Sequence, residues 1–225
     1  MCFSAGASFT SGVVLTVIGL ACLKRTDHPS QQLFAAIPLL FGVQQFSEGV
    51  LWKVLPEPND LSTQMMFTYI YLFFAQVLWP VWIPLSILML EKHETRKKIQ
   101  KVFLASGLMV SIYMAYCLLA FEAEARIEGH HITYIQNYPS IFRGYGTVLY
   151  ALATVAPPFF SHISRMWIFG TTIVISYVVS AIFYEHYVLS VWCFFSAIIS
   201  LSIYLIIRYI TGSEQRKMNV GVSGY

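Results

Sequence analysis

Charged residues are scarce in this chain: Asp, Glu, Lys and Arg make up 11% of its 225 residues, against about 25% in soluble domains. Hydrophobic residues make up 57%. A water-soluble fold of this length could not hide so much apolar surface, so the composition indicates a protein of the lipid bilayer. The net charge of +3 does not indicate nucleic-acid binding, because the basic residues cluster at the ends of apolar segments.

Several chemical signatures are missing as well. None of the four cysteines forms a CxxC pair, which excludes zinc-finger and zinc-ribbon frameworks. The last apolar segment has no lysine for a retinal Schiff base, and no apolar segment holds a histidine away from its ends for a haem. The apolar segments also lack Asp and an HxxxH motif, unlike zinc-dependent ceramide hydrolases. We therefore expect neither retinal nor haem.

Seven apolar segments are predicted to cross the membrane. In lipid a backbone must satisfy its own hydrogen bonds, so each is predicted to be a helix. The segments are Ser8–Leu23, Leu33–Leu55, Met65–Leu90, Val102–Phe121, Tyr145–Phe160, Trp167–Tyr187 and Val188–Ile210. The prediction is an all-α polytopic membrane protein with one seven-helix domain over residues 1–210 and a short cytoplasmic tail over 211–225. The first segment is expected to be an anchor, because its Lys-Arg pair follows it, unlike the basic residues of a signal peptide.

The basic residues are divided unevenly between the two sides of this arrangement. Eleven fall on one side: Lys24, Arg25, Lys92, Arg96, Lys97, Lys98, Lys101, Arg165, Arg208, Arg216 and Lys217. The other side has only Lys53, Arg126 and Arg143. By the positive-inside rule, we expect the N-terminus outside and the C-terminus in the cytoplasm of a bacterial inner membrane.

One carboxyl group, that of Glu48, falls within a predicted span. A charge there costs about 2.5–3.5 kcal/mol, so such a group usually faces the bundle interior and has a partner. Gln45, Glu48 and Trp52 share one helical stripe, and Gln44 lies one turn before Glu48. Two interpretations are open: a functional carboxyl group, or a polar clamp between helices.

Further polar side chains are predicted near the outer side. Tyr69 and Gln76 share a face of the third segment, and Tyr184 lies near the outer end of the sixth. The outer loop between the fourth and fifth segments contains ARIEGHHITYI, which predicts a β-hairpin with a Glu-Gly turn. With Gly129 in the turn, we expect His130 and Tyr134 to face the bundle together with the apolar Ile132.

Cys2 and Cys193 are also predicted on the outer side, and four hypotheses for Cys2 are open. It forms a disulfide with Cys193 or Cys117, since this side is oxidising. It binds zinc or copper with Cys193 and His130 or, less favourably, His186. It is a nucleophilic thiol activated by a nearby base. Or it is a small packing residue.

Several blocks of the sequence resemble a known family. They are MCFSA–SF at the start, PLLFGVQQFSEGVLW, WPVWIP, GHHITY and SVWCFFSA. Together they resemble a bacterial family of small polytopic membrane proteins known as a domain of unknown function. The resemblance covers nearly the whole chain and implies a stand-alone seven-helix membrane protein. It implies no activity, substrate or catalytic residue.

These residues together predict a polar pocket open to the extracytoplasmic side. Its candidate catalytic groups are Glu48 and Cys2, and its candidate lining is Gln44, Gln45, Trp52, Tyr69, Gln76, Tyr134 and Tyr184. The pocket is predicted to bind a metal or to act as a thiol-dependent enzyme on a lipid or small apolar substrate. The alternatives are a small transporter or channel, and a structural partner of another membrane protein. We expect the protein to lie in a lipid bilayer and to bind no nucleic acid.

Overall fold

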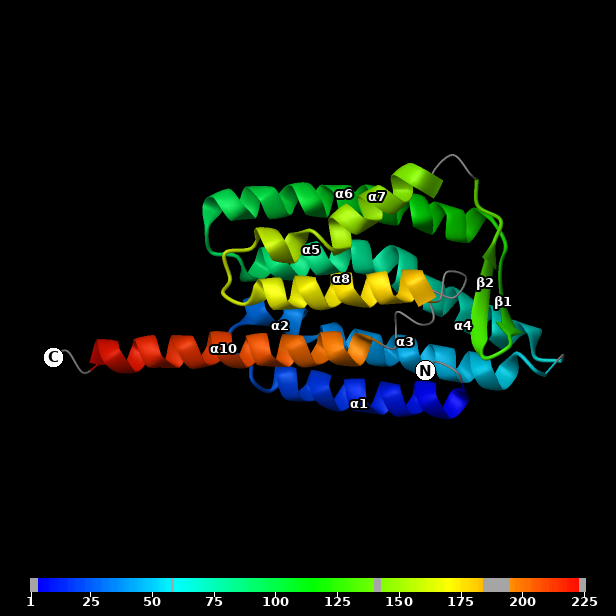
Figure 1. Ribbon diagram of the computed structural model, residues 1–225, viewed down its shortest axis with the longest axis horizontal. Coiled ribbons are helices and arrows are strands. Elements are labelled where there is room, and N and C mark those ends of the chain that lie inside the picture. Colours follow the sequence, from blue (N-terminus) through cyan, green and yellow to red (C-terminus); the bar gives the residue numbers. More distant parts are fainter. Residues whose placement is uncertain (1–3, 58, 140–142, 184–194, 223–225) are drawn as a thin grey trace.

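The structure, a computed structural model, describes residues 4–57, 59–139, 143–183 and 195–222. In it, helices run side by side in an elongated bundle, with a small two-stranded sheet across one end (Figure 1). We call this the hairpin end. The opposite end, which carries Lys24, Lys92 and Arg165, we call the basic end.

The described elements follow one another between these two ends. They are α1 (Ala5–Leu23), α2 (Pro29–Ala35), α3 (Ile37–Val54), α4 (Leu61–Leu72), the π-helix η1 (Phe73–Leu78), α5 (Trp79–Leu90), α6 (Glu94–Ala120), β1 (Ala123–Glu128), β2 (His131–Gln136), α7 (Arg143–Thr154), the 3-10 helix η3 (Pro157–Phe160), α8 (Met166–Phe183) and α10 (Ser196–Val222). At the basic end, α10 projects beyond the other helices (Figure 1).

Within the described residues, five helical stretches are long and apolar enough to cross a membrane. They are Ala5–Leu23, Pro29–Val54, Leu61–Leu90, Glu94–Ala120 and Ser196–Ser213. The prediction of a helical chain with membrane-spanning segments is confirmed in this form. The predicted count of seven spans exceeds these five stretches and stays a prediction. The apolar helix Met166–Ser180 is shorter, and the predicted turn at Glu185-His186 lies outside the described residues.

The expected helix over Tyr145–Phe160 is divided in two. Its first part, α7, has 12 residues, or about 18 Å, which is shorter than the roughly 30 Å hydrocarbon core. The second part is the four-residue helix η3, which begins at Pro157. Proline has no N–H and clashes with the preceding turn, so the Pro157-Pro158 pair ends α7 and redirects the chain.

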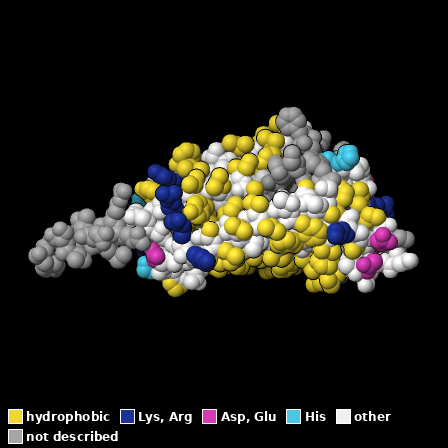
Figure 2. Space-filling view, turned by 90° about the horizontal axis from the view of Figure 1, so that it is seen from below, with side chains coloured by type: hydrophobic (Ala, Val, Ile, Leu, Met, Phe, Trp, Pro, Cys, Tyr) yellow, Lys and Arg dark blue, Asp and Glu magenta, His cyan; other side chains and the backbone are white. Residues whose placement is uncertain are grey.

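The outer surface of the helices is apolar. Figure 2 shows hydrophobic side chains over the middle of one face and Lys and Arg side chains gathered near the end from which α10 projects. Leu119, Ile182 and Ile112 are 87%, 70% and 69% exposed. Water-soluble monomers rarely expose so much contiguous apolar surface, whereas lipid chains would cover it.

The hairpin predicted from sequence is confirmed. Glu128 pairs with His131, so Gly129 and His130 form a two-residue turn, one residue later than the predicted Glu-Gly turn. Gly129 has φ +62°, while His130 does not have a positive φ. A positive φ at the first turn residue alone describes a type II′ turn, for which glycine is the favoured residue there.

One face of the hairpin packs on the helices. Ile132 is 1% exposed and Ala123 6%, and both join an apolar cluster with Leu51, Tyr71 and Leu118. Glu124 and Arg126, on the opposite face of β1, are exposed. The alternation along β1 therefore fixes which face of the sheet meets the bundle.

Candidate functional site

Three polar residues within about one turn of α3 are buried within the bundle. Gln45 and Glu48 are fully buried and Gln44 is 1% exposed. The indole Nε1 of Trp79 donates to Oε1 of Gln44 at 2.9 Å, and the Trp79 ring packs on Phe41 with centroids 4.2 Å apart. Gln44 thus links α3 to the start of α5, which matches a polar clamp between helices for this residue.

The π-helix η1 lies beside this clamp and ends at Leu78, two residues before Pro80. The backbone N–H of Trp79 donates to the carbonyl of Phe74, an i to i−5 bond. The next bond in this register would run from residue 80 to Ala75, but proline has no N–H to donate. The Tyr150 hydroxyl from α7 donates to the Ala75 carbonyl instead, at 2.7 Å. A side chain from another helix therefore satisfies the carbonyl group that Pro80 leaves.

A second hydroxyl group supports the same segment. Ser111 Oγ of α6 donates to the Val77 carbonyl at 2.6 Å. Helix α6 also comes very close to the proline, because a Cβ built on Gly107 would collide with the Pro80 carbonyl oxygen. The structure therefore accommodates Pro80 with a π-helix braced from α6 and α7.

Gln76 of η1 connects the bundle interior to the hairpin. Its Nε2 donates to Gln136 Oε1 at 3.0 Å, and its Oε1 accepts from the Tyr138 hydroxyl at 3.2 Å. Burial raises the pKa of Tyr138 to about 12, so this hydroxyl remains a protonated donor well above neutral pH. Tyr134 stacks on Tyr71 with centroids 4.6 Å apart. Two predicted site residues, Gln76 and Tyr134, thus lie on the helix–hairpin contact.

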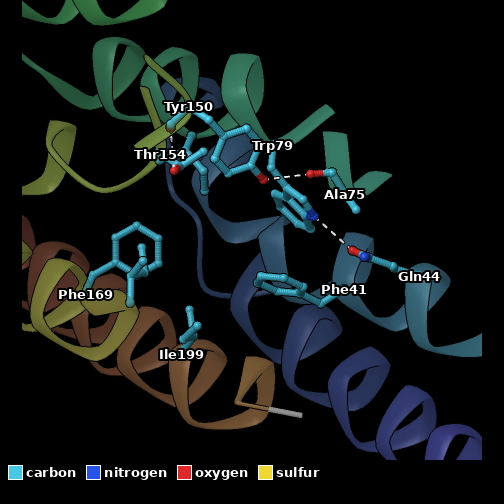
Figure 3. Close-up of a pocket in the computed structure, with 10 residues that line it drawn as sticks. Phe41, Gln44, Ala75, Trp79, Tyr150, Thr154, Phe169 and Ile199 are labelled. Atoms are coloured by element: carbon cyan, nitrogen blue, oxygen red, sulfur yellow. Dashed lines mark hydrogen bonds between the residues drawn. The ribbon is translucent and has the colours of Figure 1, made fainter. Parts of the chain in front are cut away.

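A small cavity lies between these helices and α8 and α10 (Figure 3). Its volume is about 40 Å³, room for a few water molecules rather than a substrate. The lining is mostly apolar and includes Phe41, Trp79, Tyr150 and Phe169, with Gln44 as the one predicted site residue. The centre of the bundle is therefore packed, and the predicted polar residues there are held by neighbours.

A much larger hollow lies at the hairpin end, between α4 and β1. We call it the hairpin groove, and its volume is about 820 Å³. It is lined by Leu55, Pro56, Leu61, Gln64, Met65, Thr68, Tyr69 and residues 122–127. Of the predicted site residues, Tyr69 lines it. Binding sites for small molecules commonly measure about 300–1,000 Å³, so the hairpin groove has a suitable size.

The two walls of the hairpin groove differ in polarity. On α4, Leu61 and Met65 are 65% and 58% exposed and give an apolar wall. On β1, Arg126 and Glu124 form an exposed ion pair at 2.8 Å and give a charged rim. Gln64 Nε2 donates to the carbonyls of Val54 and Glu57, both at 2.8 Å, and so fixes α4 to the preceding turn.

Of the predicted metal ligands, the structure describes only His130, so the metal site stays a prediction. No group of three His, Cys, Asp or Glu side chains able to hold a metal occurs among the described residues. His130 is exposed in the turn, and Trp52 is half-buried against the apolar cluster under the hairpin. Cys117 is a buried free thiol. The other candidates, Cys2, Tyr184, His186 and Cys193, lie outside the described residues.

Sequence reasoning missed the residues that hold this region together. Trp79, Tyr150 and Ser111 lie in apolar segments with no polar pattern around them. Their partners are 34 to 75 residues away in the chain. The only signal for them was Pro80, which must leave a carbonyl group without its helical donor.

Comparison with known proteins gives a family and no activity. No curated protein and no solved structure matches the chain. The model of a family described as "Family of unknown function (DUF6629)" matches residues 1–218. This agrees with the resemblance noted in the sequence, and the chain belongs to this family of unknown function.

Proposed function

We propose that this protein is an integral protein of a bacterial inner membrane that binds a lipid-like amphipathic molecule in the hairpin groove. The observation that carries the proposal is the contrast between the walls of this groove. An apolar chain would lie along Leu61 and Met65, and a polar head would meet Glu124 and Arg126. The cavity inside the bundle is too small for such a molecule.

The unequal charge of the two ends supports an orientation for the proposal. Lys24, Lys92 and Arg165 lie at the basic end, while Lys53 and Arg126 lie at the hairpin end. Under the positive-inside rule, the hairpin groove would open to the extracytoplasmic side, with the chain crossing the membrane seven times. The metal or thiol site at Cys2, His130 and Cys193, with Glu48 as proton-handling group, stays a prediction.

The proposal is tested by photolabelling in nanodiscs of neutral lipid. The probe is a lysophosphatidylethanolamine with a diazirine in its acyl chain, added at less than one molecule per protein. We expect cross-links to concentrate on α4 and β1. Met65→Trp, which fills the hairpin groove, is expected to lower this labelling about fivefold or more.

The matched control is Met109→Trp on α6. Met109 is 60% exposed, close to the 58% of Met65, but it does not line the groove. This variant should leave the labelling of α4 and β1 unchanged. Cross-links spread evenly over all exposed apolar helices, with equal labelling of both tryptophan variants, would overturn the proposal.

A further inference from the structure

A second hollow lies at the basic end, between the loop before α8 and the middle of α10. We call it the arginine pocket, and its volume is about 600 Å³. It is lined by Arg165, Leu205, Arg208, Tyr209, Gly212 and Ser213. It is separate from the hairpin groove, which shares none of these residues.

The backbone holds Arg165 in an unusual conformation. Its φ is +71°, the only positive φ of a non-glycine residue in the described part of the chain. Hydrogen bonds on either side maintain it: Met166 N donates to the Ile163 carbonyl at 3.1 Å, and Ile168 N donates to the Arg165 carbonyl at 2.9 Å. A left-handed arginine persists only where its surroundings impose it, and such residues cluster at binding sites.

Neither arginine has an acidic partner among the side chains that the structure describes. The Arg165 guanidinium lies over the Tyr209 ring, 4.3 Å from its centroid. Stacking of this kind leaves the in-plane N–H groups free to donate to an anion. Neither Arg165 nor Arg208 forms an ion pair with any residue whose side chain the structure describes.

A buried carboxyl group in the neighbouring hollow, that of Glu91, already accepts hydrogen bonds from the loop before α8. Glu91, in the neighbouring hollow, is 3% exposed. Its Oε2 accepts from Ser161 Oγ at 3.1 Å and from His162 N at 2.9 Å. These bonds hold the loop before α8 in place, so Glu91 serves the loop. The arginine pocket is thus a preformed positive site.

An apolar stripe on α10 leads directly to the arginine pocket. Ile198, Leu201 and Leu205 are 53%, 53% and 48% exposed. With Arg208 and Gly212 they follow alternating spacings of three and four, so all five lie along one side of the helix. A lipid with its head at Arg208 would lay an acyl chain along this stripe. Trp167, two residues after Arg165, is 61% exposed, as is typical of the membrane–water boundary.

We propose that the arginine pocket binds the phosphate group of an anionic phospholipid, with Arg165 and Arg208 as the phosphate donors and the α10 stripe as the acyl-chain contact. Basic pockets between helices at the membrane boundary are suited to such headgroups. Gly212 leaves space for the head, since a Cβ there would meet no atom within 4 Å. This site is independent of the ligand proposed for the hairpin groove.

The experiment uses the full chain purified in a neutral detergent. Phosphatidylglycerol, phosphatidylcholine or inorganic phosphate is titrated in, and bound molecules are counted by native mass spectrometry beside the thermal unfolding midpoint. We expect one tightly held phosphatidylglycerol per chain, at least tenfold weaker binding of phosphatidylcholine, and no comparable effect of inorganic phosphate. Equal effects of phosphate and phosphatidylglycerol would overturn the lipid in favour of a free phosphate ligand.

Two variants locate the binding site. Arg165→Gln with Arg208→Gln should weaken phosphatidylglycerol binding at least tenfold. The control, Lys98→Gln with Lys101→Gln, removes the same charge from two exposed side chains of α6 that do not line the arginine pocket, and it should leave binding unchanged. Gly212→Leu fills the arginine pocket without changing charge and should also weaken binding, which tests the site if the double arginine variant does not fold. Equal losses in the test and control pairs, or full binding by Gly212→Leu, would overturn the proposal.

Discussion

The bundle interior around Pro80 and the hairpin end differ in how tightly they are packed. Around Pro80, hydroxyl groups from α6 and α7 satisfy the carbonyls of Val77 and Ala75, and the remaining cavity is about 40 Å³. At the hairpin end, a groove of about 820 Å³ stays open between α4 and β1.

The difference in packing follows from the surroundings of the two regions. A backbone carbonyl without a donor is costly in lipid, so the interior must be tightly braced. The hairpin meets water and can leave room for a ligand. Gln76 joins the two regions, since it belongs to the π-helix and bonds to Gln136 and Tyr138 beyond the membrane helices.

The largest loss of stability is expected from a substitution in the tightly packed interior. Gly107→Ala would drive a methyl group into the Pro80 carbonyl oxygen, and a backbone atom cannot move aside as a flexible side chain can. We expect a loss of about 3 kcal/mol or more in the free energy of unfolding, at the upper end of overpacking effects. The measurement is the thermal unfolding midpoint in detergent. The control is Gly6→Ala, whose Cβ would meet nothing within 4 Å; equal effects of the two would contradict the tight contact.

A smaller loss of stability is expected where the hydrogen bond from Gln76 joins the bundle interior to the hairpin. Gln76→Ala and Gln136→Ala each break the same hydrogen bond, so their effects should be less than additive. We expect about 1–2 kcal/mol for Gln76→Ala, which also loses Tyr138, and about 1 kcal/mol for Gln136→Ala. A double-mutant cycle by reversible unfolding in mixed micelles measures the coupling. Strict additivity would mean that the hairpin is not held by this bond.

The smallest effect concerns the hairpin alone. Burial lowers the pKa of His131 below its usual 6.5, and the charge of neighbouring His130 adds to the shift. The folded hairpin therefore binds a proton less tightly than the unfolded chain, so hairpin stability should rise with pH up to about 6.5 and level off above it. Hydrogen exchange of the β2 amides between about pH 5 and pH 8 measures this. His131→Gln should flatten the rise, and an unchanged profile would assign it to another group.

A structural feature could be predicted from the sequence when the residues that form it lie close together along the chain. The hairpin could be predicted because Gly129 and the alternation around it lie within a dozen residues. The burial of Gln45 and Glu48 followed from their places in an apolar segment. The bond from Trp79 to Gln44 could not be predicted, because it joins residues 35 positions apart and either side chain has other suitable partners.

The sequence by itself determined that the chain forms apolar helices, that its charges gather at the helix ends, and that a hairpin follows Phe121, because composition and short-range spacing govern these features. Only the tertiary structure decided where the hollows lie. The hairpin groove needs α4 beside β1, and the arginine pocket needs Arg165 beside α10. Both depend on how distant segments pack against one another, which local sequence patterns do not encode.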